Sequence, residues 1–286
     1  MRHPFMRNAE RGRAKRHPFK TLLAVVTLLT ISACATKSSD DHVAMVDGQR
    51  VAYRMFGTGA PVVVMITGLG DGLNSFQDVA PEIAKAATVI IYDRAGYGAS
   101  SAAAGPRDAQ AADRELSGLL AQIGVRGPYV LVGHSVGGLF AEYHAAMHPD
   151  DVAGLILEDS RPADFTRRCE AADVDMCVAP ASLVRFMPNG AQAEFTSLSL
   201  TIEQVEATAP LRGKPVLVLS RSVRPNASAF DRIWSAAQDD LALRYPGSRH
   251  LVASRAGHYV HQDQAQWFAA SVVAFLGDVS RQTATR

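Results

Sequence analysis

The hydrophobic positions of the chain fall into short continuous runs that alternate with amphipathic segments. Continuous apolar runs predict strands that are buried on both faces, as in a parallel sheet. They lie at 62–66, 88–92, 129–132, 152–157 and 215–219, with a weaker run at 249–253. Helical periods separate them at 76–86, 109–123, 136–148, 230–245 and 264–275. This order predicts an α/β fold with a doubly wound, mostly parallel sheet and right-handed crossovers.

Two stretches depart from this alternation. Residues 45–53 predict two strands around a tight turn at Asp47-Gly48, because Asp-Gly supplies the positive φ angles of a hairpin. Residues 160–213 hold two cysteines, several prolines and only helix-like fragments such as 202–207. Since ligands bind at the carboxyl ends of parallel strands, we expect this insertion, between the sixth and seventh strands, to form a lid. Its apolar residues are candidates for either a pocket lining or a small core of the lid itself: Phe165, Leu183, Phe186, Met187 and Phe195.

The N-terminus has the pattern of an export signal. Seven basic residues precede the uncharged run 21–31, which is the order found in a secretory signal peptide. A membrane-spanning helix needs about 20 apolar residues, so a permanent span is not expected. Residues 31–34, Ile-Ser-Ala-Cys, resemble a bacterial lipobox, in which cleavage falls just before a cysteine that carries lipid.

This resemblance implies a removed signal peptide at 1–33 and a lipidated Cys34. Residues 34–42 are then a short polar tether to the membrane, and residues 43–286 form the folded domain. The implied location is the bacterial cell envelope, on the periplasmic side or the cell surface. The alternative is an ordinary signal peptide in which Cys34 lies near the cleavage point by chance.

Composition and charge narrow the class of protein. The chain has 286 residues, of which 48% are hydrophobic and 20% charged, so one globular α/β domain of about 250 residues is expected. Removing residues 1–34 leaves 22 Lys and Arg against 27 Asp and Glu, which disfavours a nucleic-acid partner. In an exported protein, Cys169 and Cys177 predict a disulfide, with two free thiols as the alternative. A zinc site there is disfavoured, because no further Cys or His has matching spacing.

A nucleophile motif stands at a strand-to-helix junction. Residues 133–137 read Gly-His-Ser-Val-Gly between the apolar run 129–132 and the helical period 136–148. A sharp turn at this place exposes its central side chain above the sheet, so Ser135 is the candidate nucleophile. The amide of Val136 begins the helix and faces any oxyanion that forms on the substrate.

Three segments together resemble the α/β-hydrolase family, in its esterase-type branch. They are YDRAGYGAS at 92–100, GHSVGG at 133–138 and AGHYVH at 256–261, and the likeness extends over nearly all of residues 43–278. The resemblance implies a serine hydrolase that needs no cofactor or metal. It also implies that the amide of Leu69 completes the oxyanion hole, although Thr67-Gly68 stands where relatives often have His-Gly. For Asp93 and Arg94 we favour a structural role in the loop after the strand 88–92.

A serine nucleophile needs a base whose pKa is near the working pH, and histidine is the usual one. His258 matches the catalytic loop of the family and follows the motif in the expected chain order, while His261 is its rival. The acid is less clear, because residues 220–228 contain no carboxylate where many relatives place it. Asp159 corresponds to an acid that similar sequences carry one strand earlier, and Asp231, Glu158 or no acid at all stay open.

The sequence therefore predicts an exported, lipid-anchored serine hydrolase that cleaves a small carboxylic ester. Ser135, His258 and Asp159 form the expected catalytic triad. A peptidase, an amidase or a cofactor-free peroxidase on the same fold is one alternative. A lipoprotein that binds a ligand without catalysis is the other.

Overall fold

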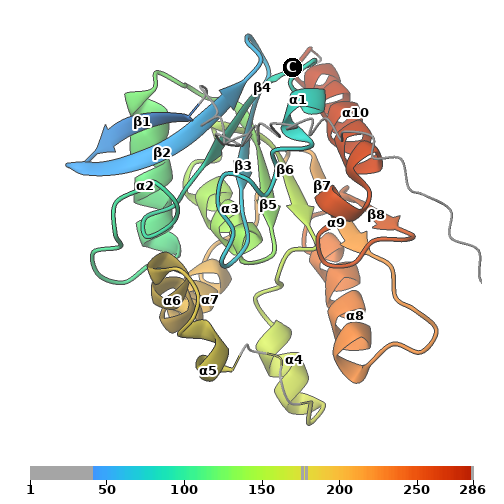
Figure 1. Ribbon diagram of the computed structural model, residues 1–286. Helices are drawn as coiled ribbons and strands as arrows, with labels where there is room; N and C mark the ends of the chain where they lie inside the picture. The colour runs from blue at the N-terminus through green and yellow to red at the C-terminus, as the bar shows by residue number, and fades with distance from the viewer. Residues whose placement is uncertain (1–40, 175–176, 178–179, 285–286) are drawn as a thin grey trace, which may run out of the picture. The chain divides into compact units, whose positions relative to one another are not determined.

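The apolar runs form one eight-stranded sheet in the computed structural model, which describes residues 41–174, 177 and 180–284 (Figure 1). The strand order is β1-β2-β4-β3-β5-β6-β7-β8. β1 pairs antiparallel with β2, β2 pairs antiparallel with β4, and all remaining pairs are parallel. The predicted α/β fold with a mostly parallel sheet is therefore confirmed. The strands are β1 (Asp41–Val46), β2 (Gln49–Phe56), β3 (Val62–Ile66), β4 (Thr88–Tyr92), β5 (Tyr129–His134), β6 (Val152–Glu158), β7 (Val216–Arg221) and β8 (Arg249–Ala253).

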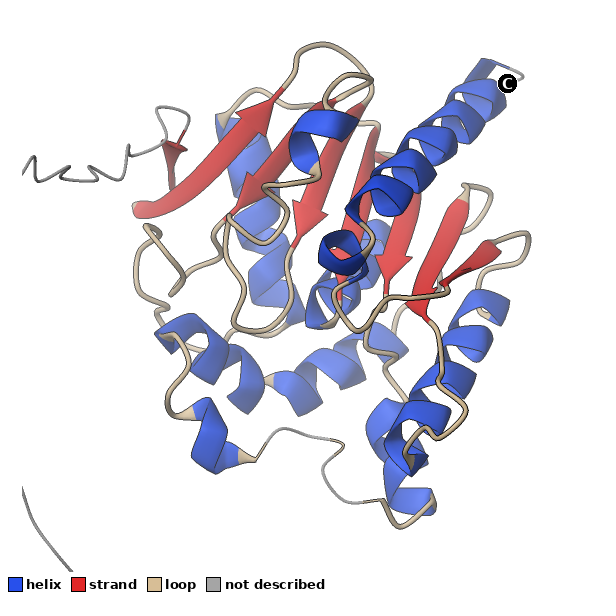
Figure 2. Ribbon diagram, turned by 45° about the vertical axis from the view of Figure 1, so that its right-hand side comes forward, coloured by secondary structure: helices blue, strands red, loops and turns tan. Residues whose placement is uncertain are grey.

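The helices cover both faces of the sheet (Figure 2). Successive residues of a strand point to opposite faces, so Val64 and Ile66 of β3 join one core while Val63 and Met65 join the other. The first core contains α2 and α3, and the second contains α1 and α10. The described helices are α1 (Ala80–Ile83), α2 (Ala109–Gln122), α3 (Val136–Met147), α4 (Phe165–Ala171), α5 (Ala181–Val184), α6 (Asn189–Thr196), α7 (Leu198–Glu206), α8 (Ala229–Leu243), α9 (Val260–Asp263) and α10 (Ala265–Ala284).

Two expectations about local structure need correction. The helical period at 76–86 yields only the single turn α1, and the rest of that segment forms other turns. Its apolar residues, among them Phe76 and Val79, are buried all the same, so the periodicity reflected burial rather than a long helix. The hairpin at Asp47-Gly48 is present, with φ of 48° and 76°, but β1 already begins at Asp41 inside the expected tether.

The segment between β6 and β7 is more helical than its sequence pattern indicated. Four short helices, α4 to α7, replace the expected helix-like fragments. They are drawn at the lower end of the view in Figure 1, toward which the carboxyl ends of the parallel strands point. The predicted disulfide joins Cys169 of α4 to Cys177 and closes a small loop. These helices therefore stand at the edge of the sheet where a ligand is expected.

The predicted signal peptide, Cys34 and residues 35–40 of the tether lie outside the described residues. Among the helices that the structure does describe, none is both long and apolar enough to cross a membrane.

Candidate active site

Ser135 occupies a strained turn between β5 and α3. Its backbone angles are φ 54° and ψ −123°, in a region that residues other than glycine rarely adopt. Neighbouring glycines make the turn possible. A Cβ atom on Gly137 would lie 2.4 Å from the carbonyl oxygens of Ile66 and Thr67, and one on Gly138 would lie 1.7 Å from Ser160 Oγ. The sequence around Ser135 therefore fits the close approach of α3 to β3 and to the loop after β6.

The register of the sheet brings the predicted serine and acid to one level. His134 of β5 pairs with Glu158 of β6, so the next residues, Ser135 and Asp159, leave the sheet side by side. The loop after β8 carries His258 to the same edge, because β8 is parallel to its neighbours. Residues far apart in sequence thus meet at the carboxyl ends of three strands.

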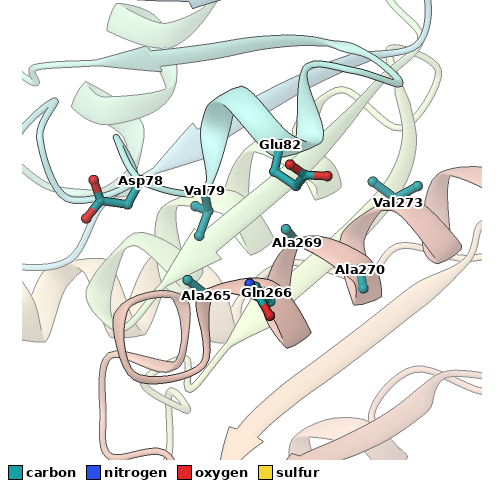
Figure 3. A pocket seen from close by; sticks show the side chains of 8 residues that line it. All are labelled: Asp78, Val79, Glu82, Ala265, Gln266, Ala269, Ala270 and Val273. Atoms are coloured by element: carbon teal, nitrogen blue, oxygen red, sulfur yellow. The ribbon is translucent and has the colours of Figure 1, made fainter.

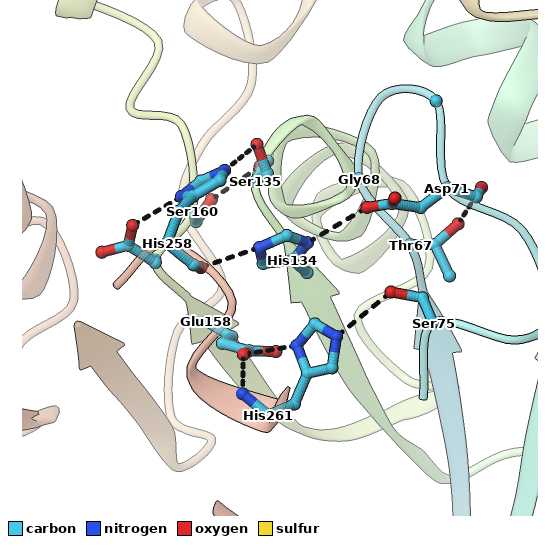
Figure 4. A network of polar contacts seen from close by, with 12 residues as sticks. Thr67, Gly68, Asp71, Ser75, His134, Ser135, Glu158, Ser160, His258 and His261 are labelled. Atoms are coloured by element: carbon cyan, nitrogen blue, oxygen red, sulfur yellow. Dashed lines mark hydrogen bonds and ion pairs between the residues drawn. The ribbon is translucent and has the colours of Figure 1, made fainter. Parts of the chain in front are cut away.

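Asp159, His258 and Ser135 form a continuous chain of hydrogen bonds (Figure 4 shows the serine and the histidine). The Asp159 Oδ2 atom lies 2.6 Å from His258 Nδ1, and His258 Nε2 lies 3.0 Å from Ser135 Oγ. An ionised carboxylate can only accept a hydrogen bond, so Nδ1 of His258 carries the proton and donates a hydrogen bond to Asp159. Nε2 is then free to accept the proton of the serine hydroxyl. This arrangement can activate the hydroxyl as a nucleophile.

The carboxylate of Asp159 is fully buried and held from two sides. The backbone amide of Arg221 donates to its Oδ1 atom at 3.1 Å, and the Arg221 guanidinium lies 3.8 Å from Oδ2. The Asp159 amide donates to the Leu219 carbonyl at 2.6 Å, and the residue adopts a positive φ of 35°. The acid is therefore fixed in the one orientation that reaches His258.

The other candidate acids bind elsewhere. Asp231 lies in the first turn of α8, where its side chain is 40% exposed and accepts hydrogen bonds from Ser228 and Arg221. Glu158 is buried and accepts from both the backbone amide and Nδ1 of His261, each at 2.7 Å. Of the three candidates, Asp159 is the one whose carboxylate contacts His258.

The rival histidine, His261, is part of a buried clamp beneath the site. Its Nε2 atom lies 3.1 Å from Ser75 Oγ, while its other nitrogen contacts Glu158 (Figure 4). These contacts join α9 to β6 and to the loop after β3. The predicted base His258 and the clamp residue His261 thus have different hydrogen-bond partners.

Two groups of described side chains have the composition of a metal site. They are Asp113 with His144 and His148, and His134 with Glu158 and His261. In each group, carboxylate and imidazole already bond one another, at 2.6 and 3.0 Å in the first and at 2.7 Å in the second. Internal hydrogen bonds account for the observed positions of both groups.

Ser135 and His258 open into a cavity of about 260 Å³. The predicted oxyanion-hole residues Leu69 and Val136 line it as well, and within the described residues their amides have no hydrogen-bond acceptor. Of the apolar insertion residues named from the sequence, Phe195 lines this cavity, whereas Leu183 and Phe186 are exposed. Phe165 instead packs edge-on against Phe230 and Trp234 in a core of its own. The full lining is Leu69, Ser135, Val136, Arg161, Cys177, Phe195, Leu198, Arg221, Phe230, Trp234 and His258.

Besides Cys177 and Leu198 of the insertion, four lining residues were not foreseen from the sequence. Phe230 and Trp234 have the i, i+4 spacing of a buried helix face, so their pattern indicates core packing and not a pocket. Arg161 lies in the loop just after β6, and Arg221 is the last residue of β7. Their position at the ends of strands is the one signal that could have singled them out.

A larger hollow of about 680 Å³ lies between α1 and α10 (Figure 3). Its lining contains two carboxylates, Asp78 and Glu82, but no serine, cysteine or histidine. It therefore lacks the hydroxyl–imidazole pair that the sequence predicts, and the smaller cavity at Ser135 is the candidate active site.

Asp93 and Arg94 support the loop that carries Leu69. The Asp93 carboxylate accepts from the amides of Leu73 and Ala99. Arg94 is buried and donates to the carbonyl oxygens of Thr67 and Gly68 at 2.8 and 2.9 Å. Both side chains therefore form hydrogen bonds to backbone groups, which fits the structural role that we expected for them.

The same arginine also ties the insertion to this loop. Arg94 Nε and Nη2 contact the two oxygens of Glu194 in α6 at 2.6 and 3.0 Å. Tyr97 donates to Glu194 at 2.6 Å and accepts from the amide of Gly70 at 3.2 Å. A buried ion pair that loses one partner is strongly destabilising. The position of α6 and that of the Leu69 loop are thus coupled.

Comparisons with known proteins agree with this architecture. A family described as alpha/beta hydrolase fold matches residues 61–283. The uncharacterized protein YqjL of Bacillus subtilis is 27% identical over 211 residues, which are 73% of this chain and 80% of that protein. The sn-1-specific diacylglycerol lipase ABHD11 of Mus musculus is 24% identical over 86% of this chain and 91% of its own.

Among solved structures, the enol-lactonase from Burkholderia xenovorans LB400 is similar in fold. Its TM-score is 0.60 at 24% sequence identity, and the match covers 82% of this chain and all of that one.

His134 lies behind His258, the candidate base, and its pKa provides a test by pH. Its Nε2 atom donates to the His258 carbonyl oxygen at 3.0 Å. Burial, with smaller contributions from His258 and His261, holds the pKa of His134 well below its usual value. The folded protein therefore keeps this imidazole neutral under conditions in which the unfolded chain protonates it.

Acidification should consequently destabilise the fold through His134. Below the unfolded pKa of about 6.5, this residue should lower the free energy of unfolding by up to about 1.4 kcal/mol per pH unit. His134→Gln keeps a donor for the His258 carbonyl and removes the titrating group, so its stability should fall less between about pH 7 and about pH 5. Denaturant unfolding at several pH values measures both slopes. Parallel slopes for the two proteins would contradict the neutral state of His134.

Proposed function

The chain belongs to the alpha/beta hydrolase fold family, and we propose that it is a serine hydrolase that cleaves a carboxylic ester. One observation carries the proposal: the buried Asp159 carboxylate contacts His258, and His258 contacts Ser135 Oγ at 3.0 Å. This chain of contacts opens into the cavity, where a substrate carbonyl can reach the serine. The lack of a carboxylate at 220–228 had left a non-catalytic protein open as an alternative, and the contact between Asp159 and His258 argues against that alternative.

In the first half of the proposed reaction, Ser135 Oγ attacks the ester carbonyl carbon. His258 Nε2 takes the serine proton as the new C–O bond forms, and Asp159 stabilises the resulting imidazolium. The amides of Leu69 and Val136 are assigned to the oxyanion of the tetrahedral intermediate. When the intermediate collapses, its bond to the alcohol oxygen breaks and His258 returns the proton to the leaving alcohol. Ser135 then carries the acyl group as an ester.

Water completes the cycle by the same steps. His258 removes a proton from a water molecule, whose oxygen attacks the acyl carbon. Collapse of the second intermediate releases the carboxylic acid and restores the Ser135 hydroxyl with the proton held by His258. Among the similar proteins, the mouse relative is named a diacylglycerol lipase, which supports an ester as the first bond to test.

The same proposal assigns helices α4 to α7 the role of a cover over the cavity. Arg161, Phe195 and Leu198 from this segment line it together with Ser135. Substrate selection by the insertion follows from that position.

We also propose that the protein is exported and lipid-anchored through Cys34 in a bacterial envelope. The support is the sequence pattern of residues 1–34 and the Cys169–Cys177 disulfide, which persists in oxidising compartments.

A fluorophosphonate probe tests the activated serine. Only a serine with a positioned base should react quickly, so the wild type should be labelled on Ser135 and should cleave short esters such as ethyl butanoate. Ser135→Ala should lose both properties, whereas Ser117→Ala on α2 should keep them. A wild type that neither reacts with the probe nor cleaves esters refutes the enzymatic function.

The choice of acid is tested by a matched pair of substitutions. Asp159→Asn replaces the acceptor of the His258 Nδ1 proton, so kcat/KM should fall by about 10³- to 10⁴-fold. Asp231→Asn removes a charge of the same sign nearby but no contact to His258, and should change kcat/KM by less than about fivefold. Full activity of Asp159→Asn together with loss of activity in Asp231→Asn would reverse the assignment.

Lipidation is tested by expressing the full chain in a bacterium and separating membranes from soluble fractions. The wild type should partition with the membranes, and its N-terminal peptide should carry a lipid mass on Cys34. Cys34→Ser should be released from the membranes, while Cys169→Ser should remain bound. Identical partitioning of wild type and Cys34→Ser would contradict the anchor.

A further inference from the structure

The candidate active site contains a buried guanidinium close to the nucleophile. Arg161 lies in the loop between β6 and α4, two residues after Asp159, and its backbone amide donates to the Ser135 carbonyl oxygen at 2.9 Å. The residue is 7% exposed, and its side chain lines the same cavity as Ser135 and His258. A fixed positive charge therefore stands in the space that receives the substrate.

The contacts of this guanidinium are few and neutral. Nη2 donates to Thr166 Oγ1, and Nη1 reaches the Cys177 carbonyl at a long 3.4 Å. The group also lies 5.2 Å from the centre of the Phe165 ring. Its Nε atom is buried without a hydrogen-bond acceptor, and within the part of the chain that the structure describes no carboxylate pairs with it.

The other buried or half-buried arginines near the site differ in this respect. Arg94 is paired with Glu194, and Arg221 contacts both Asp159 and Asp231. Arg161 is thus the cavity arginine whose charge no carboxylate among the described residues balances. Because a charge taken out of water is costly unless it is paired, this guanidinium favours an anion in the cavity.

The charge of Arg161 survives this burial. Loss of hydration lowers the pKa of its guanidinium to about 10, which still leaves the group protonated at neutral pH. An arginine fork also offers two parallel N–H donors, the geometry that matches a carboxylate.

We propose that Arg161 binds a free carboxylate of the substrate, so that the enzyme acts on small esters that carry a second, ionised carboxyl group. This inference rests on the proposed ester hydrolysis at Ser135. The cavity volume of about 260 Å³ lies below the range of drug-sized ligand sites, which fits a short substrate. Phe195, Phe230 and Trp234 give that substrate an apolar wall, while Ser135 attacks its ester carbonyl.

Three esters of similar size separate this inference from general esterase activity. Monoethyl succinate carries the carboxylate on its acyl part, O-butanoylglycolate carries it on its alcohol part, and ethyl butanoate is neutral. For the wild type, kcat/KM for at least one of the anionic esters should exceed that for ethyl butanoate by tenfold or more. Which of the two anionic esters is preferred tells whether the acyl part or the alcohol part of the substrate faces Arg161.

Substitution of Arg161 should remove the preference. The ratio of anionic to neutral kcat/KM should fall at least tenfold in Arg161→Met, because a charge-assisted pair is lost. It should fall less in Arg161→Lys, which keeps the charge without the fork. Arg167→Met makes the same charge change on α4, where Arg167 pairs with Glu206 outside this cavity, and should leave the ratio unchanged.

A binding measurement keeps the two proposals distinguishable. Calorimetric titration of Ser135→Ala with monoethyl succinate and O-butanoylglycolate needs no turnover. Arg161→Met in this background should weaken binding of the preferred ester at least tenfold, and Arg161→Lys should weaken it by a smaller factor. A reactive Ser135 with no preference for either anionic ester overturns the carboxylate site alone. Anion binding that depends on Arg161 in a protein with an unreactive Ser135 overturns the hydrolase alone. If Arg161→Met fails to fold, an unchanged ratio in Arg161→Lys together with unweakened binding refutes the site.

Discussion

The proposed chemistry of this protein depends on the hydrogen bond between Asp159 and His258. At 2.6 Å it fixes the imidazole with Nδ1 protonated, which leaves Nε2 as the acceptor 3.0 Å from Ser135 Oγ. Without that bond the ring is free to rotate or to hold its proton on the wrong nitrogen, and the serine remains an ordinary alcohol. Asp159 is buried, and this burial strengthens its hydrogen bond to His258, because bulk water does not compete for the carboxylate.

The surrounding structure holds both ends of this bond in place. The Arg221 amide fixes the acid, and His134 holds the backbone of the histidine loop through the His258 carbonyl. Glu158 and His261 clamp the helix that follows. These polar contacts therefore hold the residues of the candidate site in position and take no direct part in the proposed reaction.

The fold was largely predictable from the sequence, because buried parallel strands leave continuous apolar runs. The predicted runs at 62–66, 88–92 and 249–253 coincide with β3, β4 and β8. Ser135 was also predictable, since a glycine-flanked serine between strand and helix requires the tight turn that its backbone adopts. The segment from 160 to 213 was less so, because its short helices depend on contacts with the rest of the fold.

The identity of the acid, Asp159, and the unpaired charge of Arg161 in the cavity could not be predicted from the sequence in the same way. Three carboxylates were compatible with the chain order, and only the register that pairs His134 with Glu158 shows which one lies beside Ser135. The charge of Arg161 was equally hidden, because a sequence does not reveal whether a guanidinium has a partner. Pairing in three dimensions decides both questions.

We propose that Ser135 and His258, together with the amides of Leu69 and Val136, act on one substrate carbonyl. A crystal structure of the protein after reaction with a fluorophosphonate tests it directly. The account predicts phosphorus bonded to Ser135 Oγ, with the phosphonyl oxygen about 2.7–3.1 Å from the amides of both Leu69 and Val136. His258 should still contact Asp159 in that structure. A phosphonate on another residue, or an oxygen that faces neither amide, would contradict it.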